Sequence, residues 1–396
     1  MIILFWITVG IGGLWVFLFT KALFELRDIP HVHPAEGASW GPLPKVSVII
    51  PARDEEANIS NCIQSLLVQD HRNIEIIVVD DNSSDQTAAI VANFCKMDKR
   101  VRLVKITELP AGWTGKCNAV HQGVVQGQPT GQWLLFTDAD TIHSAQSISA
   151  PLLAAIDRNV DLITIIPHLQ AESFWERLMQ PTVAALIALF NKPAKINDPD
   201  SPEVFGNGQF IMVRSQIYKK AGGHAAIRGK VLDDTELVRA VVAAGGRMFL
   251  ALGRDLFSTR MYVNLAALIE GWAKNFYMIL ESKLPRVVLA VSLAVVMSLW
   301  PALVGLGSMA ALLLGARPWP SGWLWAGVAI YFLVMIFQAI LRGVNRWYPA
   351  YTPFAPLANL MAVYLLVRSA RLHRKGRGVT WKGRVVFDDQ ERTDGS

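Results

Sequence analysis

The stretch Val46-Ser47-Val48-Ile49-Ile50-Pro51-Ala52-Arg53-Asp54-Glu55-Glu56 decides the fold class, because an apolar strand runs directly into a cluster of acids. The pattern recurs at residues 74–79, which lead into Asp80-Asp81-Asn82, and at residues 133–137, which lead into Asp138-Ala139-Asp140. Helices are predicted between these strands, and apolar strands joined by crossover helices form a mostly parallel α/β sheet covered on both faces. Ligands bind beyond the carboxyl ends of such strands, so we expect the acids to meet in one crevice.

The composition indicates that part of the chain lies in lipid. Of 396 residues, 52% are hydrophobic and only 18% are charged. The charge deficit is concentrated in residues 2–23, whose one charged side chain is Lys21, and in residues 287–314 and 323–341, which have none. Each segment is about long enough to cross a hydrocarbon core of roughly 30 Å. We interpret the first as a retained anchor rather than a signal peptide, because no basic n-region precedes it and no A-x-A-like site follows.

We therefore predict six regions along the chain. They are a transmembrane anchor at 1–24, a linker at 25–44, a catalytic domain at 45–262, an amphipathic interface helix at 263–284, a transmembrane or re-entrant region at 285–367 and a basic tail at 368–396. An ordinary packed helix is the alternative for 263–284, and three prolines favour a re-entrant or interfacial last segment. The positive-inside rule favours an integral protein of the cell membrane with its catalytic domain and tail in the cytoplasm.

Three further observations narrow the chemistry. The basic run at 368–384 follows an apolar segment, which favours anionic lipid as its partner, so we expect no nucleic-acid partner. Three cysteines without a C-x-x-C pair indicate neither a zinc site nor a disulfide framework. The chain has no G-x-G-x-x-G or Walker A sequence to hold a pyrophosphate, which leaves a metal ion as the expected counter-charge.

Asp138 and Asp140 supply ligands for such an ion. Alternate residues at a strand end can aim at the same ion once the chain bends away from the strand. Hard oxygen donors suit Mg²⁺ or Mn²⁺, which also bind diphosphate oxygens and stabilise a departing nucleoside diphosphate. An Asp-x-Asp sequence alone is common, but its position after the fourth predicted strand favours metal binding.

Taken together, residues 46–56, Val-Val-Asp-Asp-Asn-Ser-Ser-Asp at 78–85 and Thr-Asp-Ala-Asp at 137–140 resemble family 2 glycosyltransferases with the GT-A fold. The resemblance covers about residues 45–262. Within that family the chain is similar to membrane-bound lipid glycosyltransferases, such as carotenoid, hopanoid-associated and ceramide glucosyltransferases. This similarity rests on Pro-Ala-Gly-Trp-Thr-Gly-Lys at 110–116, Thr-Arg-Met-Tyr at 259–262 and Thr-Trp-Lys-Gly-Arg at 380–384.

The resemblance implies roles for the acids and their neighbours. The residues that would bind the nucleotide sugar are Ala52, Asp54, Glu55, Asp81, Lys116, Asp138, Asn207 and Gln209. Acidic side chains would accept hydrogen bonds from the uracil N–H and the ribose hydroxyls, while Lys116 would meet the phosphates or the sugar. Asp140 would ligate the metal, with Asp138 at its shell. The residues alone also allow a solvated helix start at Asp54 and Glu55, a surface lysine at 116 and a glycine-rich turn at 206–209.

Leu-Asp-Asp-Thr-Glu-Leu at 232–237 matches a later acidic motif of the family, in which the second acid is the catalytic base. The resemblance thus implies that Asp234 is the base and that Arg260 pairs with the departing diphosphate. A carboxylate within reach of an acceptor hydroxyl contributes roughly 10²–10⁴-fold to the rate. Asp233 would adjust the pKa of Asp234 by like-charge proximity, although it also suits a helix N-cap.

These implications define an inverting, metal-dependent enzyme that moves a sugar, expected to be a hexose, from a UDP-sugar to a membrane lipid hydroxyl. Processive synthases of the family carry Gln-x-x-Arg-Trp, whereas residues 257–261 read Phe-Ser-Thr-Arg-Met. This departure favours the addition of one sugar over the extrusion of a polymer. The alternatives are a processive polysaccharide synthase, a polyprenyl-phosphate glycosyltransferase, or an inert membrane scaffold or transporter subunit. The nearly complete lack of polar residues in the spans disfavours a transporter.

Overall fold

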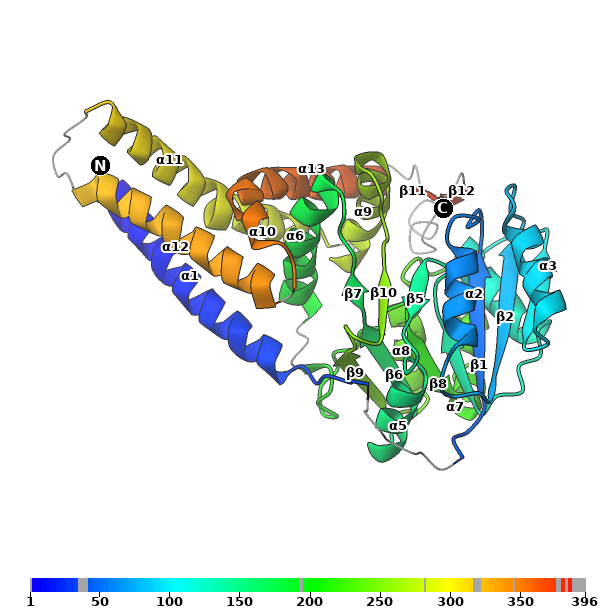
Figure 1. Ribbon diagram of the computed structural model, residues 1–396. Helices are drawn as coiled ribbons and strands as arrows, with labels where there is room; N and C mark the ends of the chain where they lie inside the picture. The colour runs from blue at the N-terminus through cyan, green and yellow to red at the C-terminus, as the bar shows by residue number, and fades with distance from the viewer. Residues whose placement is uncertain are drawn as a thin grey trace, which may run out of the picture. The chain divides into compact units, whose positions relative to one another are not determined.

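The computed structural model describes residues 2–34, 42–191, 195–280, 283–315, 322–344, 346–374, 379–381 and 384–386. The chain divides into two compact units (Figure 1). The sheet unit comprises Ile29–Gln170, Asn191–Met261 and Thr380–Ser396, and the helical unit comprises Met1–Asp28, Ala171–Phe190 and Tyr262–Val379. The region predicted as one catalytic domain, 45–262, is therefore interrupted by a segment that belongs to the helical unit.

The sheet unit is built on a seven-stranded sheet in the order β3-β2-β1-β4-β8-β6-β9. The strands are β1 (Val46–Ala52), β2 (Ile74–Asp81), β3 (Val101–Ile106), β4 (Trp133–Phe136), β6 (Leu162–Ile166), β8 (Ile211–Arg214) and β9 (Met248–Leu252). Only β8 runs antiparallel to its neighbours β4 and β6 in this described sheet. The predicted mostly parallel α/β sheet is confirmed, although the sequence had not revealed β8 and β9.

Helices cover both faces of this sheet. Val48 and Ile50 of β1 join one apolar core with α2 (Ile59–Leu67), α3 (Thr87–Met97) and α5 (Ser149–Asp157). Ile49, which points the other way, joins a second core with α4 (Gly115–Val125) and α8 (Asp233–Ala243). Because both faces of the central strands are buried, these strands are continuously apolar rather than alternating.

Strand register gathers the ends that carry the acids. Val46 is the partner of both Ile74 and Trp133, so the loops after β1, β2 and β4 leave the sheet at the same edge. A second sheet, in the order β5-β10-β7, begins directly beyond β4. Its strands are β5 (Thr141–His143), β7 (His168–Leu169) and β10 (Phe257–Thr259). The short α7 (Ser215–Lys220) and a 3₁₀ turn at Gly223–Ile227 complete this unit ahead of α8.

The helical unit consists of long apolar helices. They are α1 (Ile2–Asp28), α6 (Phe174–Asn191), α9 (Leu265–Ile279), α10 (Leu284–Ala294), α11 (Trp300–Leu313), α12 (Gly322–Val344) and α13 (Ala355–Arg374). Within this unit α12 lies beside both α1 and α11 (Figure 1). Three described stretches are long and apolar enough to cross a membrane: Leu284–Leu313, Leu324–Gly343 and Pro349–Leu372. The expected apolar helices near the C-terminus are therefore present.

Three features of this unit bear on the predicted regions. The first helix continues to Asp28, beyond the expected end of the anchor. Its described apolar stretch, Trp6–Lys21, is shorter than each of the three stretches that are long enough to cross a membrane. Pro349 and Pro353 lie in a 3₁₀ turn that leads into α13, so the segment expected to be re-entrant contains a continuous helix. Which side of the membrane each end faces stays a prediction.

The segment expected to lie along the membrane surface forms α9. Its Trp272 and Phe276 are buried in a cluster with Ala362 and Leu365 of α13. The apolar side of α9 is therefore covered by protein, as the alternative of a packed helix expects. Most of the basic tail lies outside the described residues, apart from the end of α13 and the short β11 (Val379–Trp381) and β12 (Arg384–Val386).

Candidate active site

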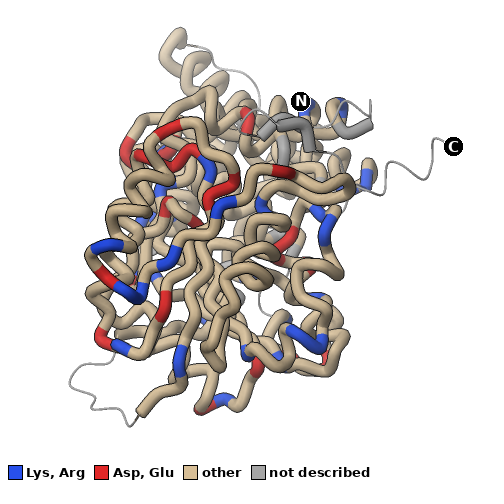
Figure 2. Tube along the Cα trace, turned by 90° about the vertical axis from the view of Figure 1, so that its right-hand side faces the viewer, with Lys and Arg blue, Asp and Glu red and all other residues tan. Residues whose placement is uncertain are grey.

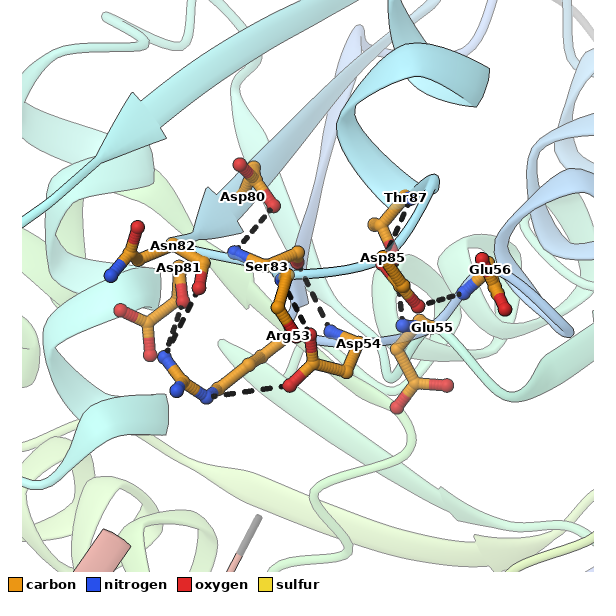
Figure 3. A network of polar contacts seen from close by, with 11 residues as sticks. Arg53, Asp54, Glu55, Glu56, Asp80, Asp81, Asn82, Ser83, Asp85 and Thr87 are labelled. Carbon is orange, nitrogen blue, oxygen red and sulfur yellow. Dashed lines mark hydrogen bonds and ion pairs between the residues drawn. The ribbon is translucent and has the colours of Figure 1, made fainter. Parts of the chain in front are cut away.

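The loops after β1 and β2 are tied together by hydrogen bonds (Figure 3). Asp54 and Asn82 have φ angles of +50° and +53°, a left-handed conformation that Asn and Asp tolerate better than most residues. The Ser84 N–H donates to Asp54 Oδ1 at 2.7 Å, and the Arg53 guanidinium donates to the Asp81 carbonyl oxygen at 2.8 Å. The structure thus brings together two predicted nucleotide-binding residues, Asp54 and Asp81, but one oxygen of Asp54 already has a protein donor.

Ala52 and Glu55 belong to the same edge. Ala52 ends β1 as the register partner of Asp80. The Glu55 N–H donates to Thr87 Oγ1 at 2.8 Å, and Glu55 Oε2 accepts from the Asn58 side chain at 2.8 Å. These contacts match the helix-start alternative for Glu55, and its role toward a nucleotide stays a prediction.

A second group of predicted residues lines a pocket of about 280 Å³, open mouth included. The lining residues are Pro51, Lys116, Val120, Phe136, Thr137, Asp138, Gly208, Ile211, His224, Asp233, Asp234 and Leu237. Lys116 comes from the first turn of α4, Asp138 follows β4, and Asp233 and Asp234 begin α8. Figure 2 shows how acidic segments crowd together with a few basic ones in the upper part of the view.

A close ion pair crosses this pocket. Lys116 Nζ lies 2.6 Å from Asp138 Oδ1. Burial by itself would lower the pKa of the Lys116 ammonium, but the carboxylates of Asp138, Asp233 and Asp234 together raise it above its ordinary value. The ammonium therefore stays charged, with Asp138 as its partner, so the surface-lysine alternative does not describe its surroundings.

Asp234 is positioned by the backbone around it. The Gly208 N–H donates to Asp234 Oδ2 at 3.1 Å, and the Thr235 N–H donates to Asp234 Oδ1 at 2.7 Å. Burial, and then the negative charge of Asp233, raise the pKa of Asp234 to about 6, against the opposing effect of Lys116 and the two N–H groups. A carboxylate with a pKa just below neutrality is suited to accept a proton at physiological pH.

The glycine-rich turn at 206–209 approaches these charged groups closely. A Cβ at Gly206 would lie 2.4 Å from the Asp234 carbonyl oxygen, and one at Gly208 would lie 3.0 Å from Lys116 Nζ. The Asn207 side chain donates to the Ile165 carbonyl at 2.7 Å, so its amide is engaged with β6. This part of the turn matches the structural alternative for Asn207, while Gln209 is buried beside it.

Asp140 has a buried carboxylate oxygen that a bound cation could pair with. Among the described residues, its buried Oδ1 has no hydrogen-bond partner. Burial, then the charges of Asp138 and Glu55, raise the pKa of Asp140 to about 7. The described residues hold no group of three or more His, Cys, Asp or Glu side chains arranged as a complete metal site. Mg²⁺ and Mn²⁺ are often bound through one or two carboxylates plus substrate phosphates, and Asp138 with Asp140 fits that pattern.

Arg260 is placed by strand pairing. Thr259, which precedes it at the end of β10, is the register partner of Thr141 in β5. Thr141 follows Asp140 directly, so the backbones of Asp140 and Arg260 lie at the same end of one strand pair. The predicted leaving-group arginine thus emerges beside the Asp-Ala-Asp turn.

One titratable residue of the pocket lining, His224, was not predicted from the sequence. His224 is almost fully buried and its Nδ1 lies 2.9 Å from the Tyr218 hydroxyl. Burial lowers the pKa of His224 to about 3, so the imidazole is neutral. The only signal in the sequence was a histidine after two glycines, and Gly222 and Gly223 take positive φ angles of 80° and 54° to turn the chain here.

Comparison with known proteins identifies the family to which residues 47–222 belong. The family model described as glycosyl transferase family 2 matches residues 47–222. These residues form a family 2 glycosyltransferase domain. The chain is therefore an enzyme of the class that its motifs predicted. Asp233, Asp234 and Arg260 lie beyond the matched residues, and their roles stay predictions.

Similar proteins cover more of the chain than the family 2 domain alone. The 4,4'-diaponeurosporenoate glycosyltransferase of Staphylococcus aureus (strain MRSA252) is 23% identical over 352 residues, which is 88% of this chain and 89% of the relative. The enzyme of the same name from Staphylococcus haemolyticus (strain JCSC1435) is 26% identical over 251 residues, 63% of this chain and 65% of the relative.

A solved structure shares the fold. It is the mannosyltransferase PcManGT from Pyrobaculum calidifontis in complex with GDP-Man and Mn²⁺, with a TM-score of 0.55 and 16% identity. The match covers 93% of this chain and 98% of that one. The GT-A-like α/β fold that the motifs predicted for the family 2 domain is confirmed.

Proposed function

We propose that this chain is an inverting, divalent-metal-dependent glycosyltransferase that moves a hexose from a UDP-sugar to a hydroxyl group of a membrane lipid. The observation that carries the proposal is the pocket in which Lys116, Asp138 and Asp234 meet. The pocket combines the charged ammonium of Lys116, the carboxylate of Asp138 from the Asp-Ala-Asp turn, and the carboxylate of Asp234, whose pKa lies near neutrality. These groups match the two ends of one displacement reaction, a departing diphosphate and an attacking hydroxyl.

Asp234 acts on the acceptor. Its carboxylate removes the proton of the lipid hydroxyl as the oxygen attacks the anomeric carbon, and this attack on the face opposite the diphosphate inverts the configuration. The N–H groups of Gly208 and Thr235 hold the carboxylate in one orientation, so little reorganisation is needed at the moment of transfer. Asp233 contributes by keeping the pKa of Asp234 raised.

Lys116 and Arg260 act on the donor. The Lys116 ammonium neutralises charge on the diphosphate end of the nucleotide sugar, and Arg260 pairs with the nucleoside diphosphate as it leaves. Asp140, together with Asp138, would hold Mg²⁺ or Mn²⁺, which binds diphosphate oxygens and stabilises their negative charge. The solved structure with the similar fold contains Mn²⁺ and GDP-Man, which supports a metal and a nucleotide sugar in this enzyme too.

The acceptor is proposed to stay in the bilayer. Three stretches of the helical unit are long and apolar enough to cross a membrane. Both relatives are named as glycosyltransferases of 4,4'-diaponeurosporenoate, which is a carotenoid. A membrane enzyme with its family 2 domain in the cytoplasm would take its UDP-sugar from the cytoplasm and its lipid acceptor from the bilayer. We therefore assign the acceptor to the membrane lipids rather than to soluble alcohols.

The decisive test is the variant Asp234→Asn. Membranes that contain the wild-type or variant enzyme are incubated with labelled UDP-hexoses and Mn²⁺, and the lipid extract is analysed by mass spectrometry. We expect one hexose on a lipid with the wild-type enzyme and a loss of about 10²–10⁴-fold with the variant, with UDP binding unchanged. The exposed Asp157→Asn is a matched control. Label in long glycans would favour a processive synthase, and full turnover of the variant would exclude Asp234 as the base.

A carboxylate acceptor is the second candidate. The relatives are named for diaponeurosporenoate, and the ending -oate denotes a carboxylate. A carboxylate is already deprotonated at neutral pH, so the transfer of a sugar to it needs no base. Asp234→Asn would then retain most activity, and mild alkali would cleave the product as an ester. A lipid glycoside formed from a hydroxyl would resist that treatment.

A further inference from the structure

A series of buried, hydrogen-bonded side chains leads from Gln69 to the Asp-Ala-Asp turn. The donor and acceptor of each bond can be assigned by starting from Gln69. The Gln69 side-chain nitrogen donates to the carbonyl oxygens of Ser65 at 3.0 Å and Ser144 at 2.6 Å. Gln69 Oε1 must therefore be the acceptor, and it receives the Ile148 N–H at 3.2 Å and the Ser147 hydroxyl at 3.1 Å. The single hydrogen of Ser147 is thus directed to Gln69.

This direction determines the tautomer of His143. Its Nδ1 lies 3.0 Å from Ser147 Oγ, and because the Ser147 hydrogen points to Gln69, Nδ1 must carry a hydrogen and donate. Burial lowers the pKa of His143 to about 3, so the ring is neutral. The other nitrogen, Nε2, is then an acceptor only.

The acceptor nitrogen faces the two threonines that bracket the turn. Thr141 Oγ1 lies 3.0 Å and Thr137 Oγ1 3.2 Å from His143 Nε2. Each hydroxyl also has a carbonyl acceptor, the Asp138 oxygen 2.7 Å from Thr141 Oγ1 and the Gln209 oxygen 2.8 Å from Thr137 Oγ1, so its single hydrogen is shared between that oxygen and Nε2. Thr137 precedes Asp138 and Thr141 follows Asp140, so the imidazole is bonded to both ends of the three-residue turn.

The same ring also contacts the strand that leads to Arg260. His143 is the register partner of Phe257, and their rings stack with centroids 5.5 Å apart. Two residues further along β10, Thr259 pairs with Thr141. Gln69, Thr137, Thr141, His143 and Ser147 are all buried. Because these groups are buried, they depend on one another for their hydrogen bonds and restrict one another's positions.

We infer that His143 is a positioning residue: through the hydroxyls of Thr141 and Thr137 it holds the turn that carries Asp138 and Asp140 and aligns it with the strand before Arg260. The inference rests on the proposed metal-dependent transfer. His143 does not touch the substrate, and it acts by fixing the two carboxylates. Residues that orient metal ligands in this way change metal affinity or activity by about 10–100-fold when they are replaced.

Two replacements of His143 distinguish the contacts of its two ring nitrogens. In His143→Gln the side-chain amide reaches the place of Nε2, so its oxygen still accepts from Thr141. In His143→Asn the shorter amide reaches the place of Nδ1, so the bond to Ser147 is kept and the bond to Thr141 is lost. We expect His143→Asn to weaken Mn²⁺ binding about tenfold or more in the presence of UDP, and His143→Gln to restore most of it.

Binding is measured on the full-length enzyme in detergent, by electron paramagnetic resonance of free Mn²⁺, and turnover with the UDP-sugar is measured beside it. A role in stability alone would affect both variants alike and leave the Mn²⁺ affinity of the folded fraction unchanged, which would overturn the inference. Thr141→Val with its partner Thr141→Ser provides a second test if the histidine variants do not fold, with binding lost in the first and kept in the second. Wild-type enzyme that binds no Mn²⁺ would overturn the proposed function and this inference together. Wild-type binding with equal affinity in Thr141→Val would overturn this inference alone.

Discussion

Thr141 and Thr259 are register partners in the antiparallel pair of β5 with β10, and this pairing sets Asp140 and Arg260 at the same end of two adjacent strands. The two residues belong to motifs that are far apart in the sequence. Neighbouring strands hold their backbones at a nearly constant separation of about 5 Å. The proposed metal ligand and the proposed cation for the departing diphosphate therefore have a common rigid support, which a pair of loops would not provide.

The rate of transfer to a hydroxyl acceptor should follow the ionisation of Asp234. Its pKa of about 6 lies above the ordinary value, so the base is deprotonated above pH 6 and becomes protonated below it. We expect kcat/KM to fall about tenfold for each pH unit below 6. A pH–rate profile measured at saturating Mn²⁺ checks this, and a flat profile between pH 5 and 7 would contradict it.

Replacement of Lys116 should move that profile. The ammonium lowers the pKa of Asp234, so Lys116→Met should shift the acidic limb to higher pH while weakening the binding of UDP. Lys116→Arg keeps the charge and should restore most of the original limb. A Lys116→Met enzyme with an unshifted limb would show that the two groups are not coupled.

Gly208→Ala should impair catalysis without unfolding the protein. The new Cβ would lie 3.0 Å from Lys116 Nζ and 3.3 Å from Asp234 Oδ2, so the flexible lysine must move and the base is disturbed. A displacement of about 1 Å near a reacting group can lower the rate roughly 10²-fold. Gly307→Ala, where a Cβ meets nothing within 4 Å, is the matched control. Equal kcat values for the two variants would contradict the prediction.

Chelation should abolish transfer, and Asp140 should reveal why. Its pKa of about 7 means that the fold disfavours the ionised carboxylate when no cation is bound, so this group destabilises the metal-free protein as the pH rises. In EDTA at pH 8, Asp140→Asn should therefore unfold at a higher temperature than the wild type and show no stabilisation by Mn²⁺. A lower unfolding temperature for the variant would indicate a structural role instead.

Glu75 should make the sheet unit sensitive to acid. Burial would raise its pKa, but hydrogen bonds from Ser47 and Thr130, with the charge of Lys45, lower it to about 2. An acid with a lowered pKa stabilises the fold above its unfolded value of 4.5, and the effect is lost as the pH falls from 4.5 toward 2. The contribution is on the order of 3 kcal/mol. The thermal stabilities of Glu75→Gln and wild type should differ most at pH 7, less at pH 3 and hardly at all at pH 2.

The central sheet and most of the acids at its edge were predictable, because those signals are local. Continuous apolar runs such as residues 46–50 report burial on both faces, and an acid directly after a strand marks the ligand-binding edge. The strands β8 and β9 were missed because they are short and lie among irregular segments. The packing of α9 was left open because its partner, α13, lies far along the chain.

The amino-acid sequence alone was enough to establish the α/β class, the apolar helices and the acidic motifs of a family 2 glycosyltransferase, since each depends on neighbouring residues. Tertiary structure was needed to show that Lys116, Asp138 and Asp234 share one pocket and that Asp54 is partly engaged with Ser84. It was also needed to reveal His143 beneath the turn. These contacts join segments whose separation in sequence carries no information about distance, and only strand order and register bring them together.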